Sequence, residues 1–262
     1  MITDVNAFLG NYPFRRVPGT SPEALLTAMT RVGITDAWVS HLPGLWWRNP
    51  AEGNHWLYET TRRFPRLRPV PAIHPGIPGW EKALDDASAN GAPAIRVDPG
   101  QYGLGATNPV MARLVLACAA AGVPIVLAVR LEDGRQRHPA DTAPELSAAA
   151  VRTLIRLDRR TRLLVTHAER SFIEEVHFGS TPDEASRIWW DTSWVWGPPE
   201  DHFQQLLATM GSDRFVFGTG QPLRIPEAAV AKLDLLELER EARRAIESGN
   251  IRSLMTARSL AS

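Results

Sequence analysis

Charged and polar side chains in this 262-residue chain directly follow short apolar runs, at positions suited to catalysis. The segments AlaIleArgValAsp and LeuAlaValArgLeuGlu carry Arg96, Asp98, Arg130 and Glu132. An arginine that interrupts a buried run needs an acidic partner or an anionic ligand, because an unpaired charge is costly away from water. His167 also ends an apolar run, and histidine titrates near neutral pH. These residue types suit acid–base chemistry on a small, carboxylate-bearing molecule.

The elements that must position these residues alternate between short β-branched runs and longer amphipathic ones. Strands are expected over residues 2–8, 35–40, 67–73, 92–97, 123–129, 162–166, 188–193 and 214–218. Helices are expected over 22–31, 51–63, 78–90, 108–121, 144–155, 169–178 and 199–210, and again from residue 226. Eight strand-then-helix units with apolar strands predict an α/β fold, a (β/α)8 TIM-type barrel with one domain over residues 1–262.

The active site of such a barrel lies at the C-terminal ends of its strands. The polar residues expected there are Asn6, Ser40, His41, His74, Arg96, Asp98, Arg130, Glu132, Asp133, His167, Asp191, Ser193, Thr219 and Gln221. We interpret several of them as the lining of a ligand pocket. The alternative is a lattice of arginine–carboxylate pairs that holds the barrel mouth together.

Four segments resemble motifs of the amidohydrolase-related proteins. AspValAsnAlaPheLeuGly (4–10) is similar to the first-strand motif AspValHisAlaHisLeuGly, and ValThrHisAlaGlu (165–169) to the sixth-strand motif. PheGlyThrGlyGlnPro (217–222) is similar to the eighth-strand PheGlyThrAspXPro, and GluSerGlyAsnIleArgSerLeuMet (247–255) to the closing GlyAsnAlaXXLeuLeu helix. The segments follow the family order along the chain. The resemblance implies a barrel hydrolase or, in one branch of the family, a decarboxylase.

The departures from these motifs fall on the family's metal-ligand positions. Two first-strand histidines and an eighth-strand aspartate, which help to hold a divalent ion in the family, correspond here to Asn6, Phe8 and Gly220. Phe and Gly side chains cannot ligate a metal, and Asn is a poor zinc ligand. Only His167 keeps its type, and the fifth-strand region has no histidine before His138. We therefore predict no catalytic metal and no other cofactor.

Hydrolysis without a metal needs a base, a cation for the developing oxyanion, and groups that position the substrate. The predicted catalytic residues are His167, Asp98, Arg130, Glu132 and Asp191. His167 is the predicted base, while Asp98 and Asp191 are candidates either to orient it or to act as the base themselves. Arg130 is a candidate for the oxyanion site. Glu132 is either a general acid or the partner of an arginine.

The predicted substrate-binding residues are Asn6, His41, Trp47, Arg96 and Trp194. Arg96 can clamp a substrate carboxylate or share the oxyanion role, because guanidinium binds carboxylates bidentately. Four of the nine tryptophans (Trp46, Trp47, Trp194 and Trp196) fall in loops expected at the mouth of the barrel, which is the end where the strands have their C-termini. Trp38 and Trp190 are expected in the core. This distribution indicates an aromatic-walled pocket, with a homo-oligomer interface as the alternative.

Composition narrows the function classes. The formal net charge is zero, which predicts binding to neither nucleic acid nor an anionic membrane. Cys118 is the only cysteine, and we find no signal peptide and no membrane-spanning segment, so we expect a cytoplasmic protein with a small-molecule substrate. We predict a metal-independent hydrolase of an amide, lactone or ester in a small aromatic or apolar substrate. The alternatives are a catalytically inactive barrel that binds a ligand or partner subunit, and a metal-free decarboxylase.

Overall fold

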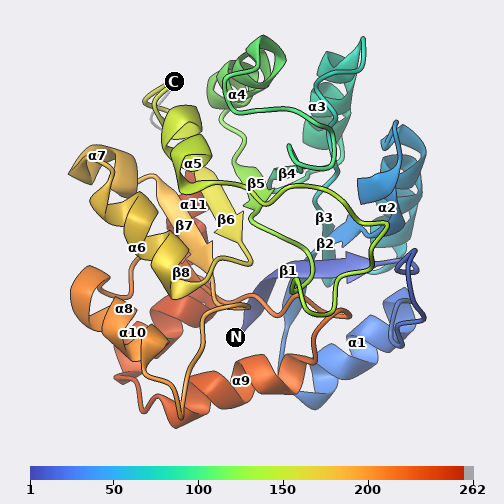
Figure 1. Ribbon diagram of the computed structural model, residues 1–262. Coiled ribbons are helices and arrows are strands. Elements are labelled where there is room, and N and C mark those ends of the chain that lie inside the picture. The colour runs from blue at the N-terminus through green and yellow to red at the C-terminus, as the bar shows by residue number, and fades with distance from the viewer. Residues whose placement is uncertain (257–262) are drawn as a thin grey trace.

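A ring of eight parallel strands, surrounded by helices, forms the centre of the computed structural model, which describes residues 1–256 (Figure 1). The strands are β1 (Thr3–Leu9), β2 (Asp36–His41), β3 (Leu67–Pro69), β4 (Ile95–Val97), β5 (Ile125–Ala128), β6 (Leu163–Thr166), β7 (Ile188–Asp191) and β8 (Phe215–Val216). Ladders connect β1 to β3 and β4 to β8 in chain order. The Arg96 amide donates to Pro71 O at 2.8 Å, and the Val5 amide to Phe217 O at 2.9 Å. These bonds close the ring, so the predicted (β/α)8 barrel is confirmed.

The outer layer contains the helices. They are α1 (Pro22–Arg31), α2 (Ala51–Arg63), α3 (Trp80–Ala89), α4 (Pro109–Ala121), α5 (Ala148–Ile155), α6 (Arg170–Phe178), α7 (Pro182–Ala185), α8 (His202–Met210), α9 (Pro226–Leu235), α10 (Arg240–Arg244) and α11 (Asn250–Thr256), with short turns η1 (Pro43–Trp46) and η2 (Ala245–Gly249). Their starts follow ordinary capping chemistry, since Ser21 accepts from the Ala24 amide and Asn108 from the Val110 amide. Gly122 ends α4 in the left-handed conformation.

Some boundaries differ from those expected. Strand β3 ends at Pro69 and not at residue 73, because Pro69 and Pro71 have no N–H to donate to a ladder. Helix α5 begins after the capping residue Ser147 and not at residue 144. Helix α7 was not expected; Thr181 starts it with a capping box.

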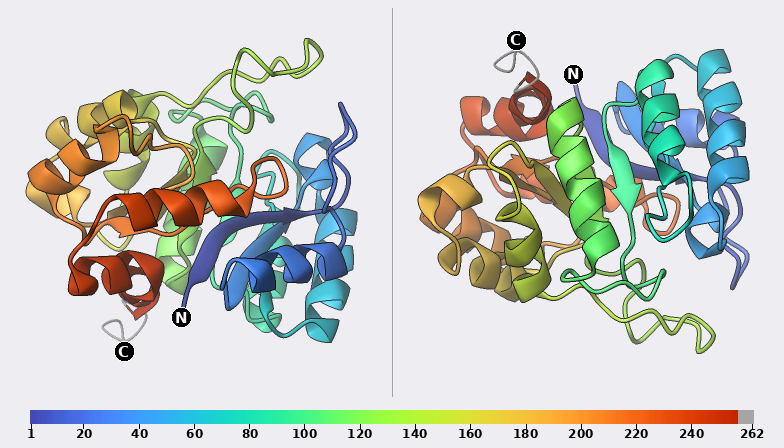
Figure 2. Two further views of the ribbon diagram at one scale, coloured as in Figure 1. Left: turned by 90° about the horizontal axis from the view of Figure 1, so that it is seen from below. Right: turned by 90° about the horizontal axis from the view of Figure 1, so that it is seen from above.

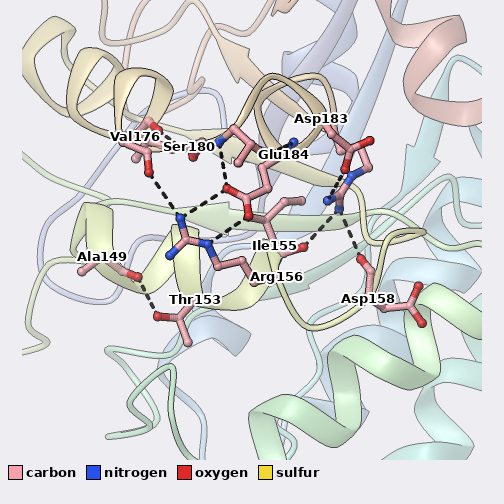
Figure 3. Close-up of polar contacts among 12 residues, drawn as sticks. Ala149, Thr153, Ile155, Arg156, Asp158, Val176, Ser180, Asp183 and Glu184 are labelled. Carbon is pink, nitrogen blue, oxygen red and sulfur yellow. Dashed lines mark hydrogen bonds and ion pairs between the residues drawn. The ribbon is translucent and has the colours of Figure 1, made fainter.

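Helices α5 and α7 are joined on the outer surface by an ion pair. The Arg156 Nε donates to Glu184 Oε1 at 3.0 Å, and the Arg156 side chain is half exposed (Figure 3). Nearby, the Ser180 hydroxyl donates to Val176 O at 2.7 Å. Exposed pairs of this kind contribute little to stability, so Arg156 serves below as a control arginine on the outer helical layer.

The lower barrel interior is filled by an apolar floor cluster. Its members are Val5, Trp38, Val70, Ala94, Val126, Leu164, Trp189 and Val216, closed from below by Ile251 and Leu254 of α11. The Asn250 amide donates to Ser212 O and Phe215 O at 2.7 Å, which fixes α11 beneath β8. Helix α11 lies at the same end of the barrel as the N-terminus (Figure 2). Trp190 faces the helices and contacts Phe172, as strand alternation predicts.

The opposite end of the barrel is covered by a second apolar group, the cap cluster. It consists of Phe8, Tyr12, Val17, Leu42, Leu45, Ala72, Ala128 and Leu131. The long loop after β5 projects at this end (Figure 2). It meets the loop after β1 where Arg15 Nη2 donates to Glu132 Oε1 at 2.7 Å and where the Phe14 and His138 rings stack at 5.1 Å. In residues 1–256 no helix has the length and apolarity needed to cross a membrane.

We expect Leu164→Ala to lower the free energy of unfolding by about 2–5 kcal/mol, because it removes packed methyl groups and leaves a cavity in the floor cluster. Urea unfolding measures this loss. The matched control is Leu116→Ala, at an exposed position of α4, with an expected change within about 0.5 kcal/mol. Equal effects of the two substitutions would contradict the assigned barrel interior.

Candidate active site

Asn6 lies at an irregularity of β1 that turns its side chain into the barrel. The pairing of β1 with β2 shifts register between Asp4 and Ala7, as in a β-bulge. Val5 consequently packs in the floor cluster, while the neighbouring Asn6 side chain is also fully buried. Asp4 stabilises this backbone, because its Oδ1 accepts the Asn6 and Thr219 amides, both at 3.0 Å. The first-strand motif thus places an amide inside the barrel.

Four buried residues form a polar centre between the floor and cap clusters. They are Asn6, Arg96, His167 and Asp191, each at most 1% exposed. The Asn6 Nδ2 lies 2.8 Å from His167 Nε2 and 2.9 Å from Asp191 Oδ2. Its Oδ1 accepts from Arg96 Nη2 at 2.9 Å. Both N–H bonds and the oxygen of the Asn6 amide are therefore used.

The His167 imidazole is engaged at both nitrogens. Its Nδ1 lies 2.6 Å from Arg130 O, a group that can only accept, so Nδ1 carries the proton and Nε2 accepts from Asn6. Burial and the nearby Arg96 charge lower the pKa of His167 to about 3. Its backbone is left-handed, with φ 58°, and its amide is held by Asp191 Oδ1 at 2.9 Å. This arrangement does not favour the base role predicted for His167; its bonds position other groups.

Both carboxylate oxygens of Asp191 are likewise hydrogen-bonded. Its two oxygens accept from the His167 amide and the Asn6 side chain, and burial raises its pKa. The catalytic role predicted for Asp191 remains a prediction, and the geometry gives it the task of orienting His167. This matches the alternative in which a carboxylate orients the histidine.

The positions that correspond to metal ligands in the amidohydrolase-related motifs do lie together. The Phe8 ring centroid is 6.2 Å from that of His167, and a Cβ added to Gly220 would lie 3.2 Å from His167 Nε2. The motif assignment is thus spatially consistent. However, residues 1–256 contain no group of three or more His, Cys, Asp or Glu side chains that could hold an ion. The residues present do not fit a divalent metal.

A cleft of about 290 Å³, here called the mouth cleft, opens beside the polar centre. It is lined by Leu131, Glu132, Trp194, Trp196, Leu223 and Arg224, among others. Two guanidinium groups lie against the Trp194 ring, with the Cζ of Arg224 at 4.0 Å and that of Arg130 at 5.3 Å from its centroid. Within the described chain, no carboxylate lies in ion-pair range of the Arg224 guanidinium. The cleft therefore combines an aromatic wall with an unpaired cation.

Several buried polar atoms around the mouth have no hydrogen-bond partner among the described residues. They are Arg96 Nη1, Asp98 Oδ2, Tyr102 OH, Arg130 Nε, Glu132 Oε2 and Trp194 Nε1. A buried polar atom without a partner costs about 1–3 kcal/mol, so a ligand or water is expected to pair with it. Burial raises the pKa of Glu132, although Arg15 opposes the shift. The unpaired atoms at the mouth are therefore open to hydrogen bonds from water or from a polar ligand.

Asp98 follows β4 and lies beside a small cavity. Its side chain and that of Arg130 line a cavity of about 30 Å³, which has room for a water molecule. Burial raises the pKa of Asp98 to about 6, and the Arg96 charge opposes the shift. A carboxylate with this pKa is largely ionised at neutral pH and still binds a proton readily.

The other predicted binding residues are placed differently. Arg96 and Asn6 belong to the polar centre, and Trp194 belongs to the mouth cleft. The His41 ring instead contacts Trp47 at 5.1 Å and Trp56 at 5.0 Å, and burial lowers its pKa to about 4. The contact with Trp56 places His41 against α2, with Trp47 beside His41, and the binding role of both residues remains a prediction.

Arg224 was missed by the sequence analysis. It lies four residues after Gly220, in the loop between β8 and α9, and a basic side chain in a mouth loop was the available signal. The polar residues expected at the C-terminal ends of the strands stopped at Gln221, because nothing in the sequence indicates that Arg224 stacks on Trp194 from another loop. Tyr102, whose ring stacks on His74 at 4.0 Å, was missed for the same reason.

Comparison with known proteins identifies the fold. No family model and no curated protein matches the sequence. A dihydroxybenzoic acid decarboxylase from a Polaromonas species, solved with manganese and 2-nitroresorcinol, superposes with a TM-score of 0.74 at 15% identity, covering 97% of this chain and 96% of that one. A protein described as a 2-pyrone-4,6-dicarboxylic acid hydrolase from Pseudomonas putida gives 0.70 at 16%, covering 97% of each chain. One described as an amidohydrolase from Staphylococcus aureus gives 0.68 at 14%, covering 97% and 99%. The chain therefore has the barrel fold of these proteins over its whole length.

We expect Asp98→Asn to make the chain more stable at pH 8. Because folding raises the pKa of Asp98, its stabilising contribution is complete below the unfolded value of 3.8 and is lost as the pH rises through about 6. The rise in the pKa of Asp98 corresponds to at most about 3 kcal/mol in the free energy of unfolding. Urea unfolding of both proteins between pH 4 and pH 8 measures the difference. For Asp133→Asn the sign is opposite, because hydrogen bonds from Arg135 lower the pKa of the partly exposed Asp133. A pH-independent difference for Asp98→Asn would refute the shift.

Proposed function

We propose that this chain is a metal-independent hydrolase of amide, lactone or ester bonds in a small flat ring that bears a carboxylate. The observation that carries this proposal is the set of unpaired buried polar atoms on Asp98, Arg130, Glu132 and Trp194, at the ends of β4, β5 and β7. Arg130 and Glu132 do form ion pairs, with Glu145 at 2.9 Å and with Arg15 at 2.7 Å, but these pairs leave Arg130 Nε and Glu132 Oε2 without a partner. Their unpaired state supports a site built for a ligand.

The mouth cleft supports the choice of substrate class. The face of Trp194 suits a flat ring, and the guanidinium of Arg224 suits a carboxylate, which it can bind in a bidentate manner. The volume of about 290 Å³ lies at the small end of the usual range for ligand pockets, about 300–1,000 Å³. A single ring with one or two carboxylates is the matching size.

Asp98 and Arg130 support hydrolysis. In the proposed reaction Asp98 removes a proton from a water molecule in the adjoining cavity, and the water oxygen attacks the substrate carbonyl carbon. The unpaired Arg130 Nε–H stabilises the oxyanion that develops. When the C–N or C–O bond breaks, the leaving group takes the proton from Asp98. The polar centre orients the Arg130 backbone through His167.

Two other functions are favoured by specific observations. Decarboxylation of a ring carboxylate is favoured by the likeness to a dihydroxybenzoic acid decarboxylase. An inactive barrel that only binds a ligand is favoured by the saturation of His167 and Asp191 within the polar centre. Cys118, buried in α4 with its pKa raised to about 12, supports the further proposal of a reducing, cytoplasmic location.

We expect Arg224→Ala to weaken the binding of ring carboxylates by about tenfold to a hundredfold, because a charge-assisted hydrogen bond contributes about 1.5–3 kcal/mol. Calorimetric titration with benzoate and pyrone carboxylates measures the change. Arg156→Ala removes an arginine from the outer layer and is expected to bind as the wild type does (Figure 3). Equal affinities for wild type and Arg224→Ala would exclude the mouth cleft as the binding site.

We expect the rate of hydrolysis to rise with pH through about 6, because Asp98 must be ionised to act as the base. Asp98→Asn is expected to lower kcat by at least about a hundredfold while the substrate still binds. A screen of lactones, esters and amides, read by product analysis, supplies the substrate. Release of carbon dioxide would favour decarboxylation, and tight binding without turnover would favour the inactive barrel.

A further inference from the structure

The polar centre lacks a set of metal ligands, yet Asn6, His167 and Asp191 are hydrogen-bonded to one another. We infer that Asn6 and Arg96 together replace a divalent cation: Asn6 joins His167 to Asp191, and Arg96 supplies the positive charge. This inference goes beyond the proposed reaction and does not depend on which substrate the mouth cleft binds.

The first argument is the use of lone pairs. A metal at this centre would bind the unprotonated Nε2 of His167 and a carboxylate oxygen of Asp191. Both atoms instead accept hydrogen bonds from the Asn6 Nδ2, at 2.8 Å and 2.9 Å. One –NH2 group therefore joins two acceptors that are both chemically able to bind an ion.

The second argument is charge. The Asp191 carboxylate is fully buried, and a buried anion needs a nearby cation. Arg96 is 1% exposed and donates from Nη2 to Asn6 Oδ1 at 2.9 Å, opposite the bonds to His167 and Asp191. It thus polarises the amide, whose N–H groups become stronger donors. Lys232, whose Nζ donates to the carbonyl oxygen of Thr192 next to Asp191, and Arg224 also act electrostatically on Asp191.

The third argument is the shape of the surroundings. Arg96 is fixed by Ser40 Oγ, which accepts from its Nε at 3.0 Å, and its Cζ lies 4.8 Å from the Phe8 ring centroid. Phe8 thus packs against the organic cation at a position that carries a ligand in the related motif. Gly220, at the other such position, has no side chain, and a Cβ there would lie 3.2 Å from His167 Nε2. The substituted positions therefore suit the hydrogen-bonded centre.

The test is Asn6→Asp, a nearly isosteric change that replaces two donors with acceptors. The variant presents two carboxylates beside His167 Nε2, a set of ligands that binds transition metals. Equilibrium dialysis with zinc chloride is expected to give about one zinc per chain for the variant and none at this centre for the wild type. Zinc is expected to raise the Tm of Asn6→Asp by several degrees, because it binds only the folded chain.

Asn54→Asp is the matched control. Asn54 is also buried, and its side chain bonds to the backbone N and O of Ala72, outside the polar centre. The same substitution there is expected to lower the Tm without rescue by zinc. If zinc bound equally to the two variants and raised their Tm equally, any added buried carboxylate would have the same effect. That result would overturn the inference.

The wild-type chain provides a second measurement in case Asn6→Asp fails to fold. Nitrogen NMR is expected to show a neutral His167 imidazole, protonated at Nδ1, that does not change when zinc is added. One zinc per wild-type chain, lost in His167→Ala, would overturn the inference, as would a folded Asn6→Asp that takes up no zinc. The dialysis and NMR experiments measure metal content and the protonation of His167, and neither depends on turnover. If no substrate is turned over, that result counts against the proposed hydrolase and leaves the inference about Asn6 and Arg96 unaffected.

Discussion

The burial of an arginine beside the barrel axis is the constraint on which the centre of this structure depends. Arg96 is cut off from water, so its charge must be matched by the nearby Asp98 carboxylate, by oxygen acceptors and, through Asn6, by the Asp191 carboxylate. Asp191 in turn holds His167 in a left-handed backbone conformation, and His167 bonds to the backbone of Arg130. A single buried charge thus fixes the ends of β4, β6 and β7 relative to one another.

The barrel itself could be predicted from the sequence, because alternating apolar strands and capped helices leave few other topologies. The meeting of Asn6 with His167 followed from the first-strand and sixth-strand motifs. The bridging role of Asn6 could not be predicted, because a register shift in β1 directs its side chain inward and no local signal marks that shift. The neutral form of His167 could not be predicted either, because its lowered pKa results from burial and from the charge of Arg96, which lies far away in the sequence.

The mouth was harder to predict than the centre. Arg130, Glu132 and Trp194 were expected there, but the stacking of Arg224 on Trp194 joins two loops that are distant in sequence. His41 and Trp47 follow a strand as the others do, yet the His41 ring packs against Trp56 of α2, with Trp47 beside it. Position after a strand therefore identifies candidates for a site, while the conformation of each loop decides which candidates meet.

The contacts between the loops after β1 and β5 have a consequence for their response to salt. One ion pair, Arg15 with Glu132, and one stacked pair of rings, Phe14 on His138, connect these loops above the cap cluster. The Arg15 side chain is 42% exposed, so ionic strength weakens its attraction to Glu132. The contact between the two loops therefore combines a salt-sensitive ion pair with the apolar packing of Tyr12, Val17 and Leu131 in the cap cluster. Dissolved salt is expected to loosen the polar edge of this contact and to leave its apolar part in place.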